Sequence, residues 1–180
     1  MNQFAKKMIL LGEFEGIDFY RYSPTLFQPY FVDYPAQEQP PYASRPVHKI
    51  RMMLEYLRGG YQVIYMARGN RILGHIVVAR GGRRLKISTP EDIVIGPIFV
   101  SPALRGQGIG TIGIRTVLKK LDLQYRCAYE FIAAENTASI RTVEKNGYVL
   151  AGRVKESGIL RNLVESEDGN LLVYRFAVQH

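Results

Sequence analysis

The sequence has one cysteine, no tryptophan and no apolar run as long as the roughly 18 residues that span a membrane as a helix. The single Cys127 excludes an internal disulfide and favours a reducing compartment. Because Cys127 stands in a strand-like run, we expect it to be buried and to pack as a small apolar residue. The apolar patch from Met8 to Leu11 is too short for the core of a signal peptide. We therefore expect a cytoplasmic protein without a membrane-spanning segment.

Zinc-ligand spacing, a DNA-recognition helix and an RNA-stacking motif do not stand out in the sequence either. The charge is strongly positive, with 24 basic and 16 acidic residues and a formal net charge of +8. Such an excess fits nucleic acid, a membrane surface or a polyanionic cofactor. The densest basic cluster, residues 80–86, is predicted to be a hairpin loop with solvated arginines. We expect an anionic ligand, with no metal, nucleic acid or membrane as a partner.

The pattern of apolar residues predicts one α/β domain over residues 1–180. A helix is expected to begin at Pro46 and to end at Gly59-Gly60. The last two predicted strands are expected to form a hairpin with its turn at Asp168-Gly169. The other helices are predicted at 108–121 and 137–146, and the strands at 17–22, 61–67, 71–79, 91–100, 126–133, 148–156 and 170–178.

The segment from Ser23 to Pro46 is unusual because it holds six of the nine prolines. Prolines at this density disfavour both a helix interior and a central strand. Two interpretations remain open at this point, an ordered loop over a pocket and a mobile arm.

The segment from Gly96 to Gly110, GPIFVSPALRGQGIG, combines a strand end with a glycine-rich turn. The strand is predicted to end at Val100, and residues 105–110 are predicted to open a helix. Glycines let the backbone approach a ligand, and the free amides of a helix N-terminus attract anions. Arg105 adds a positive charge suited to a phosphate. The spacing fits neither G-x-G-x-x-G nor a Walker loop, which needs Gly-Lys-Ser/Thr.

Residues 105–110 resemble the Arg/Gln-x-x-Gly-x-Gly/Ala signature of the GNAT superfamily of N-acetyltransferases. Residues 136–141 (NTASIR) and 144–148 (EKNGY) resemble its second motif, in which an asparagine begins a helix that ends in Gly-Phe or Gly-Tyr. The resemblance covers residues 90–150. It is closest to the branch of ribosomal-protein N-terminal acetyltransferases and related small-amine enzymes. It implies a mixed, mostly antiparallel twisted sheet of about six or seven strands, with helices on both faces and splayed central strands.

The resemblance implies acetyl-CoA as the co-substrate, without a metal. The strand that ends at Val100 would line the pantetheine arm, the amides of 106–110 would hold the pyrophosphate, and Asn136 would contact the arm. An asparagine there is equally suited to be a helix N-cap. The implied cofactor-binding residues are Ile98, Phe99, Val100, Arg105, Gly106, Gln107, Gly108, Ile109, Gly110, Thr111, Asn136 and Ser139.

The sequence departs from the family at the general acid. Many members place a tyrosine seven residues after the motif asparagine, where it protonates the leaving thiolate, and Val143 stands there in this chain. In the branch that the chain resembles, a serine at the position of Ser139 is the candidate for this role. Its alternative role is a hydrogen bond to its own backbone in the first helical turn.

The reaction also needs a general base, because an amine with a pKa of about 10 must lose a proton before it attacks. Several residues are candidates for this base. Carboxylates expected near the cleft are Glu91, Asp92, Glu130 and Glu135. Asp92 shares its strand parity with Val100. Glu130 lies in an apolar run that can raise its pKa. The predicted catalytic residues are Ser139, Glu130 and Asp92, and a chain of water molecules is the alternative to any one base.

Tyr30, Tyr34 and Tyr42 are predicted to bind the acceptor, since segment 23–46 falls where the family builds its acceptor site. His75 is expected to be a packed histidine. The expected activity is acetyl transfer from acetyl-CoA to a primary amine of a small molecule, by direct attack on the thioester. The alternatives are a protein N-terminal or lysine acetyltransferase and a non-catalytic coenzyme A sensor. Homodimers are common in the family, but the sequence identifies no interface.

Overall fold

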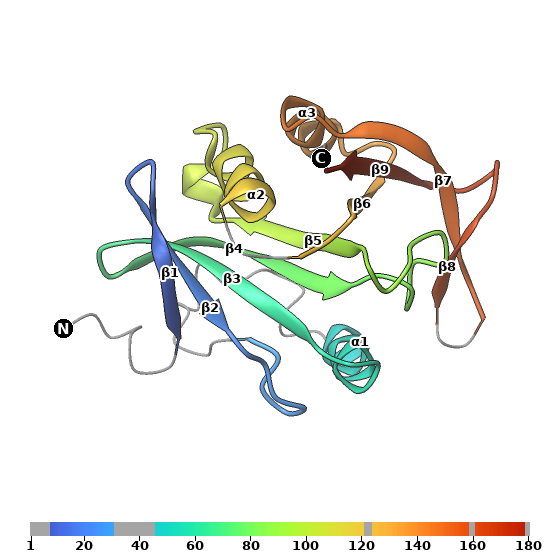
Figure 1. Ribbon diagram of the computed structural model, residues 1–180, viewed down its shortest axis with the longest axis horizontal. Coiled ribbons are helices and arrows are strands. Elements are labelled where there is room, and N and C mark those ends of the chain that lie inside the picture. The colour runs from blue at the N-terminus through green and yellow to red at the C-terminus, as the bar shows by residue number, and fades with distance from the viewer. Residues whose placement is uncertain (1–7, 31–45, 121–123, 159–160, 179–180) are drawn as a thin grey trace. The chain divides into compact units, whose positions relative to one another are not determined.

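The computed structural model of the chain describes residues 8–30, 46–120, 124–158 and 161–178. The predicted helices and strands are present, with ends shifted by a few residues. In chain order (Figure 1) the elements are β1 (Ile9–Phe14), β2 (Ile17–Tyr22), α1 (Pro46–Leu57), β3 (Tyr61–Arg68), β4 (Arg71–Arg80), β5 (Ile93–Val100), the 3-10 turn η3 (Pro102–Leu104), α2 (Ile109–Lys119), β6 (Cys127–Ala133), α3 (Thr137–Lys145), β7 (Val149–Ser157), β8 (Asn162–Glu165) and β9 (Leu171–Ala177). Among the described residues, no helix is long and apolar enough to cross a bilayer.

The strands form the mixed, mostly antiparallel sheet that the sequence predicts. They follow one another in the order β1-β2-β3-β4-β5-β6-β9-β7-β8. Neighbours β5 and β6 run parallel, with Ile93 opposite Ala128 and Val94 opposite Tyr129. The predicted splay of these strands further along the chain stays a prediction. The described residues form nine strands, more than the six or seven expected, because β1 and the four-residue β8 carry too little apolar alternation to be recognised.

The chain divides into two compact units. The N-terminal unit comprises Met1–Val78 and Pro97–Gly113, and the C-terminal unit comprises Ala79–Gly96 and Ile114–His180. Strands β4 and β5 and helix α2 therefore each contribute to both units. The expectation of a single domain stays a prediction, and the units are described separately below.

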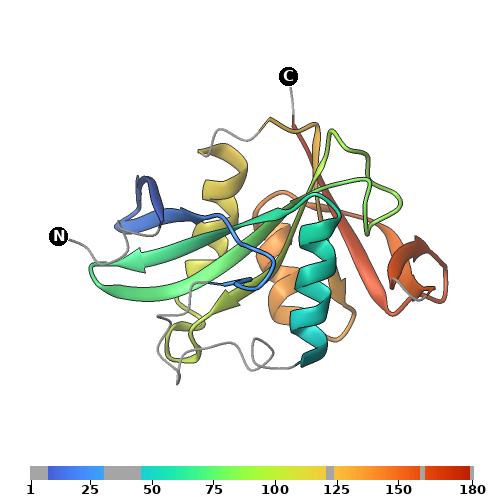
Figure 2. The same cartoon turned by 90° about the horizontal axis from the view of Figure 1, so that it is seen from below.

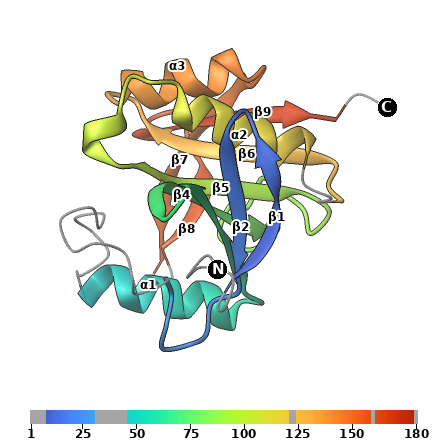
Figure 3. The ribbon, with the colours of Figure 1, turned by 90° about the vertical axis from the view of Figure 1, so that its left-hand side faces the viewer.

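The core of the N-terminal unit is built on β2 and β3. The β1–β2 hairpin (blue in Figure 3) is antiparallel, and β2 continues the pairing to β3 with Phe19 opposite Met66. Phe19, Tyr65 and Met66 are fully buried. A methyl group added at Gly74 of β4 would lie 2.2 Å from the carbonyl oxygen of Phe99. Glycine at this position therefore allows the backbones of β4 and β5 to approach each other closely.

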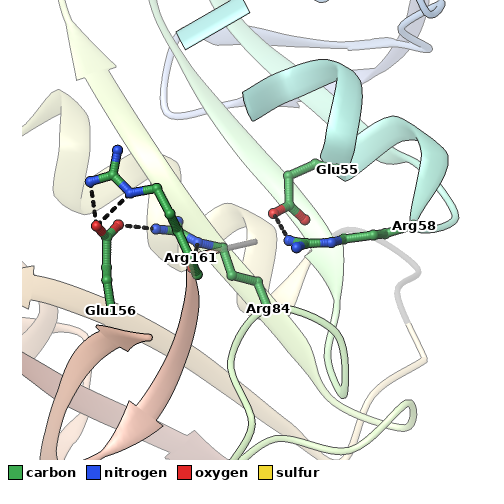
Figure 4. Close-up of polar contacts among 5 residues, drawn as sticks. All are labelled: Glu55, Arg58, Arg84, Glu156 and Arg161. Atoms are coloured by element: carbon green, nitrogen blue, oxygen red, sulfur yellow. Dashed lines mark hydrogen bonds and ion pairs between the residues drawn. The ribbon is translucent and has the colours of Figure 1, made fainter. Parts of the chain in front are cut away.

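Helix α1 (teal in Figure 2) has nearly the bounds that the sequence predicts. It begins at Pro46 and is followed by Gly59 and Gly60, both with positive φ. Met52 is its buried residue among those described. At its C-terminal end Glu55 pairs with Arg58, which directly follows the helix, at 3.0 Å (Figure 4). Such a pair adds little to stability, so packing holds the helix in place.

The C-terminal unit corrects the predicted final hairpin. Strand β7 does pair with β9, as expected, with Val149 opposite Arg175. The chain nevertheless turns first into β8, which pairs with the other edge of β7, and Asp168-Gly169 then joins β8 to β9. The core beside these strands contains Cys127, which is a free, buried cysteine as expected. Its partners in this core are Leu85, Tyr129, Val154, Leu163 and Val173.

The basic loop also differs from its prediction, because Arg84 is buried rather than solvated. Its guanidinium donates to Glu156 Oε1 at 2.7 Å and to the carbonyl of Arg161 at 3.1 Å. It also lies 5.1 Å from the centre of the Phe131 ring. Arg161 forms a second ion pair with Glu156 (Figure 4). Part of the positive charge therefore fixes the loop to the turn after β7 instead of facing a ligand.

The close contact at Gly74 predicts a large effect of one added methyl group. Gly74→Ala should lower the free energy of unfolding by about 1–3 kcal/mol, because β4 and β5 must separate to admit it. Gly60→Ala is the control, since a methyl group there meets no heavy atom within 4 Å and only the positive φ opposes it. Urea denaturation of both variants measures the difference. Equal losses in the two variants would contradict the packing role of Gly74.

Candidate functional site

The glycine-rich turn lies in the N-terminal unit and follows β5 directly. The amide of Ser101 donates to the carbonyl of Leu73 at 2.8 Å, which anchors the strand end. Gly106 and Gly108 have φ values of +79° and +78°, in the left-handed region that favours glycine. A methyl group at either glycine would meet no heavy atom within 4 Å. The outer side of the turn is therefore open.

Helix α2 begins at Ile109, immediately after this open turn. The first amides of a helix have no carbonyl within the helix to donate to, and the helix dipole places partial positive charge there. Arg105 is exposed on the turn, and its Nε reaches the carbonyl of Val100 at 3.4 Å. Residues 105–108 form an exposed, positively polarised turn, and the predicted phosphate-binding stretch continues through the buried Ile109 to Gly110 in the first turn of α2. Their binding role stays a prediction.

Asn136 and Ser139 lie in the C-terminal unit, at the start of α3. The side-chain oxygen of Asn136 accepts a hydrogen bond from the amide of Ser139 at 3.2 Å. This is the N-cap geometry that was the alternative to cofactor binding. Ser139 is half-buried, and Val143, one turn further on, is buried in the core. The hydroxyl of Ser139 therefore lies on the same helix face as the position where the family tyrosine would stand.

Asp92 is completely buried, and its contacts are structural. Its Oδ2 accepts from the amide and the hydroxyl of Thr89, at 2.7 and 2.9 Å. Its Oδ1 accepts from the amide of Cys127 at 3.1 Å. Both oxygens thus have protein partners that fix the start of β5 to the start of β6. A catalytic role for Asp92 stays a prediction, and these hydrogen bonds explain its burial without one.

Glu130 is also a buried carboxyl, but unlike Asp92 it has an oxygen without a hydrogen-bond partner in the described part of the chain. Its Oε1 has no hydrogen-bond partner among the described residues, and the same is true of the Tyr148 hydroxyl. Burial raises the pKa of Glu130 to about 8, with the Tyr148 hydroxyl acting weakly in the opposite direction. Burial and the neighbouring Glu130 raise the pKa of Tyr148 well above its ordinary value. The two groups therefore interact without satisfying hydrogen-bond geometry, and Glu130 is mostly protonated at neutral pH.

A cluster of rings in the N-terminal unit surrounds His75. His75 is buried, as expected, with its ring centre 5.1 Å from that of Tyr30 and 5.6 Å from those of Tyr65 and Phe99. The hydroxyl of Tyr30 lies 2.9 Å from Nε2 of His48, and the planes of these two rings are within 14° of parallel. Of the predicted acceptor residues, Tyr30 joins this cluster, whereas Tyr34 and Tyr42 lie outside the described residues.

His48 carries no signal in the sequence that would predict a functional role. Its partner Tyr30 is 18 residues away in the sequence, within the proline-rich segment 23–46. No periodicity links two such positions. Burial, with a further effect of Arg51, lowers the pKa of His48 to about 4, and burial with a further effect of His48 lowers that of His75 to about 3. Both imidazoles are therefore uncharged at neutral pH.

The raised pKa of Glu130 predicts how stability depends on pH. Between its ordinary value of 4.5 and about 8 the unfolded chain releases this proton while the folded chain keeps it. Stability should therefore fall as pH rises through this window, by up to a few kcal/mol from this group. Glu130→Gln should flatten that decline, measured as the difference between the urea-unfolding curves of variant and wild type at pH 5 and pH 8. Parallel curves at both pH values would show that the carboxyl is not held protonated.

Solved structures of other proteins resemble the fold of this chain. RimL, a ribosomal L7/L12 α-N-protein acetyltransferase, has a TM-score of 0.61 at 14% identity, covering 95% of each chain. The ribosomal-protein-S18-alanine N-acetyltransferase of Escherichia coli has a TM-score of 0.51 at 13% identity, covering 72% of this chain and 77% of that one. The microcin C7 self-immunity acetyltransferase MccE, in complex with acetyl-CoA and AMP, has a TM-score of 0.50 at 14% identity, covering 73% and 69%.

These structures establish the fold alone. No curated protein matches the sequence significantly. The family model described as "Acetyltransferase (GNAT) family" matches residues 24–148, which is more than half of the chain and includes both motifs. The chain therefore belongs to the acetyltransferase (GNAT) family.

Proposed function

We propose that this acetyltransferase moves an acetyl group from acetyl-CoA to the primary amine of a small molecule, by direct attack of the amine on the thioester. One observation carries the cofactor assignment. The turn at Gly106 and Gly108 is open on its outer side, is followed by the amides that begin α2, and bears Arg105. An open backbone turn with positive polarity matches a pyrophosphate group.

The chain's own residues would share the work as the resemblance implies. Ile98, Phe99 and Val100 offer strand backbone to the pantetheine arm, whose amides need hydrogen-bond partners. Arg105 and the amides of residues 106–110 hold the phosphates. Asn136 is the N-cap of α3, and the resemblance implies that it also contacts the cofactor arm. When bound, acetyl-CoA supplies the activated acetyl thioester.

Two proton transfers remain for protein groups. The thiolate that leaves needs a proton, and we assign its delivery to the hydroxyl of Ser139, since Val143 cannot donate one. The attacking amine must lose a proton. Glu130 is a weak candidate for this step near neutral pH, because burial raises its pKa to about 8 and keeps most of it protonated there. Asp92, with both oxygens engaged, is better suited to hold β5 in place.

A small-molecule acceptor is favoured by the ring cluster around His75. Tyr30 and His48 are half-buried, so they present only part of their surface, and a compact amine suits such a surface better than a polypeptide. The protein-directed alternative is favoured by the likeness to acetyltransferases that act on ribosomal proteins. Turnover measured as thiol release on a panel of small amines, with N-terminal peptides and lysine peptides beside them, distinguishes the two.

Acetyl-CoA should raise the melting temperature of the wild-type protein by mass action. Gly108→Val should weaken acetyl-CoA binding at least tenfold, because the side chain enters the open space where the phosphates approach. Gly16→Val is the matched control, since Gly16 also has a positive φ of 72° and open surroundings, but lies in the β1–β2 turn. Calorimetric titration measures both affinities. Equal acetyl-CoA affinity in the two variants would remove the phosphate assignment.

Ser139→Ala should lower kcat by about 10²–10⁴-fold with little change in the KM for acetyl-CoA, as expected for a lost general acid. Thr137→Ala is the control, because Thr137 is exposed in the first turn of the same helix. Steady-state kinetics at saturating amine separate kcat from KM. A kcat equal to that of the control would assign the proton to water.

A further inference from the structure

Glu130 and Tyr174 lie side by side on the face of the sheet that α3 covers. They are directly opposite each other in the antiparallel pair β6–β9, so their side chains project from the same face. Both are buried, and the hydroxyl of Tyr174 donates to Glu144 Oε1 of α3 at 3.3 Å. Helix α3 also packs on β6 (Figure 3). The Glu130 carboxyl therefore lies in the layer between the sheet and α3, within the C-terminal unit.

Tyr148 holds the C-terminal end of α3 in this layer. Its amide donates to the carbonyl of Val143 at 3.2 Å, and its ring centre lies 5.7 Å from that of Phe176 of β9. Phe176 is two residues beyond Tyr174 and so shares its face of the sheet. The Tyr148 ring is buried, and its hydroxyl interacts with the Glu130 carboxyl. The two residues therefore join the end of α3 to the middle of β6.

This contact suits an uncharged Glu130 and not a carboxylate. The Glu130 Oε1 and the Tyr148 hydroxyl have no hydrogen-bond partner among the described residues. The described titratable groups that act on the pair or lie beside it are Tyr125, Tyr174 and Glu144, and none of them carries positive charge. A buried carboxylate without partners is costly, so it needs water or a donor that moves toward it. Ionised Glu130 would therefore admit water beside Tyr148 and loosen the packing of α3.

Helix α3 connects this contact to Ser139. The helix is only nine residues long, so it moves as one short rigid element. Asn136 caps its start through the hydrogen bond from the amide of Ser139 at 3.2 Å. The contacts of Tyr148 fix its other end. A shift at that end therefore also changes where the Ser139 hydroxyl lies.

We propose that Glu130 is a positioning residue for acetyl transfer, which in its uncharged form keeps α3 packed on the sheet through Tyr148 and so holds Ser139 in place. This inference rests on the proposed function, in which Ser139 protonates the leaving thiolate. When Glu130 ionises, its proton goes to solvent and a carboxylate is left beneath α3. With a pKa of about 8, this occurs within about one pH unit on either side of that value. The contribution of Glu130 to kcat should therefore fall as pH rises, whereas a general base would contribute more.

Glu130→Gln tests this role, because the amide has the size of the carboxyl and no charge at any pH. The wild-type kcat at saturating amine is divided by that of the variant, which cancels the titration of the amine itself. We expect a ratio within about twofold of one near pH 6.5 and about a tenfold lower ratio near pH 9, where roughly nine-tenths of Glu130 is ionised. Glu167→Gln is the matched control, because Glu167 is an exposed carboxyl of the same unit. The ratio of wild type to this control should not change with pH.

A second variant acts on the same titration from the other side of the contact. Tyr148→Phe keeps the ring and removes the hydroxyl that favours the charged form of Glu130. It should therefore move the decline in kcat to higher pH, and it tests the inference even where Glu130→Gln folds poorly. Melting curves at both ends of the pH range check that each variant is folded during the assay.

The direction of the pH effect separates positioning from the other roles of a buried carboxyl. A ratio that rises with pH would make Glu130 the general base, and a constant ratio would leave it a role in stability alone. Either result would overturn the inference, as would a decline that Tyr148→Phe does not move. A wild-type protein that binds acetyl-CoA but acetylates no amine or peptide would instead overturn the proposed function on which the inference rests.

Discussion

The approach of β4 to β5 at Gly74 is the constraint on which the rest of the N-terminal unit depends. Only a residue without a side chain lets the Phe99 carbonyl come this close. The same contact places the amide of Ser101 on the carbonyl of Leu73, which fixes where the glycine-rich turn begins. It also brings the ring of Phe99 against His75, and so links the turn to the ring cluster. The absence of a side chain at Gly74 thus aligns the glycine-rich turn with the ring cluster around His75, although the two are separate in the sequence.

The distribution of charge shows why net charge is a coarse guide to ligands. The formal charge of +8 suggested an anionic ligand, and Arg105 on its exposed turn fits that idea. Arg84 and Arg161, in contrast, share Glu156 and hold the loop after β4 to the turn after β7. A buried guanidinium over an aromatic ring contributes to folding rather than to binding. The composition cannot tell an arginine that binds an anionic ligand from one that stabilises the fold. Its burial and its interaction partners in the structure can.

The features that the sequence predicts are those that local rules govern. Helix α1 could be read from Pro46 and the glycines that follow it, and the turn before α2 from its glycine spacing. Strands β1 and β8 could not, because their residues alternate weakly and gain their structure from neighbours. The Tyr30–His48 contact escaped for a stronger reason, since it joins positions whose separation follows no repeat. Glu130 was identified as unusual from its apolar flanks, but only the fold shows that it is held protonated.

The burial of Cys127 has a practical consequence for measurements on this protein. It is the chain's sole thiol, it lies in the core of the C-terminal unit, and it is only 8% exposed. A thiol-reactive dye added to the folded protein should therefore report coenzyme A as it is released, with little background from the enzyme. When the C-terminal unit unfolds, Cys127 becomes accessible and the same dye reacts with one further thiol per chain. A single reagent can thus follow turnover in the native state and, under denaturing conditions, count the molecules whose core has become accessible.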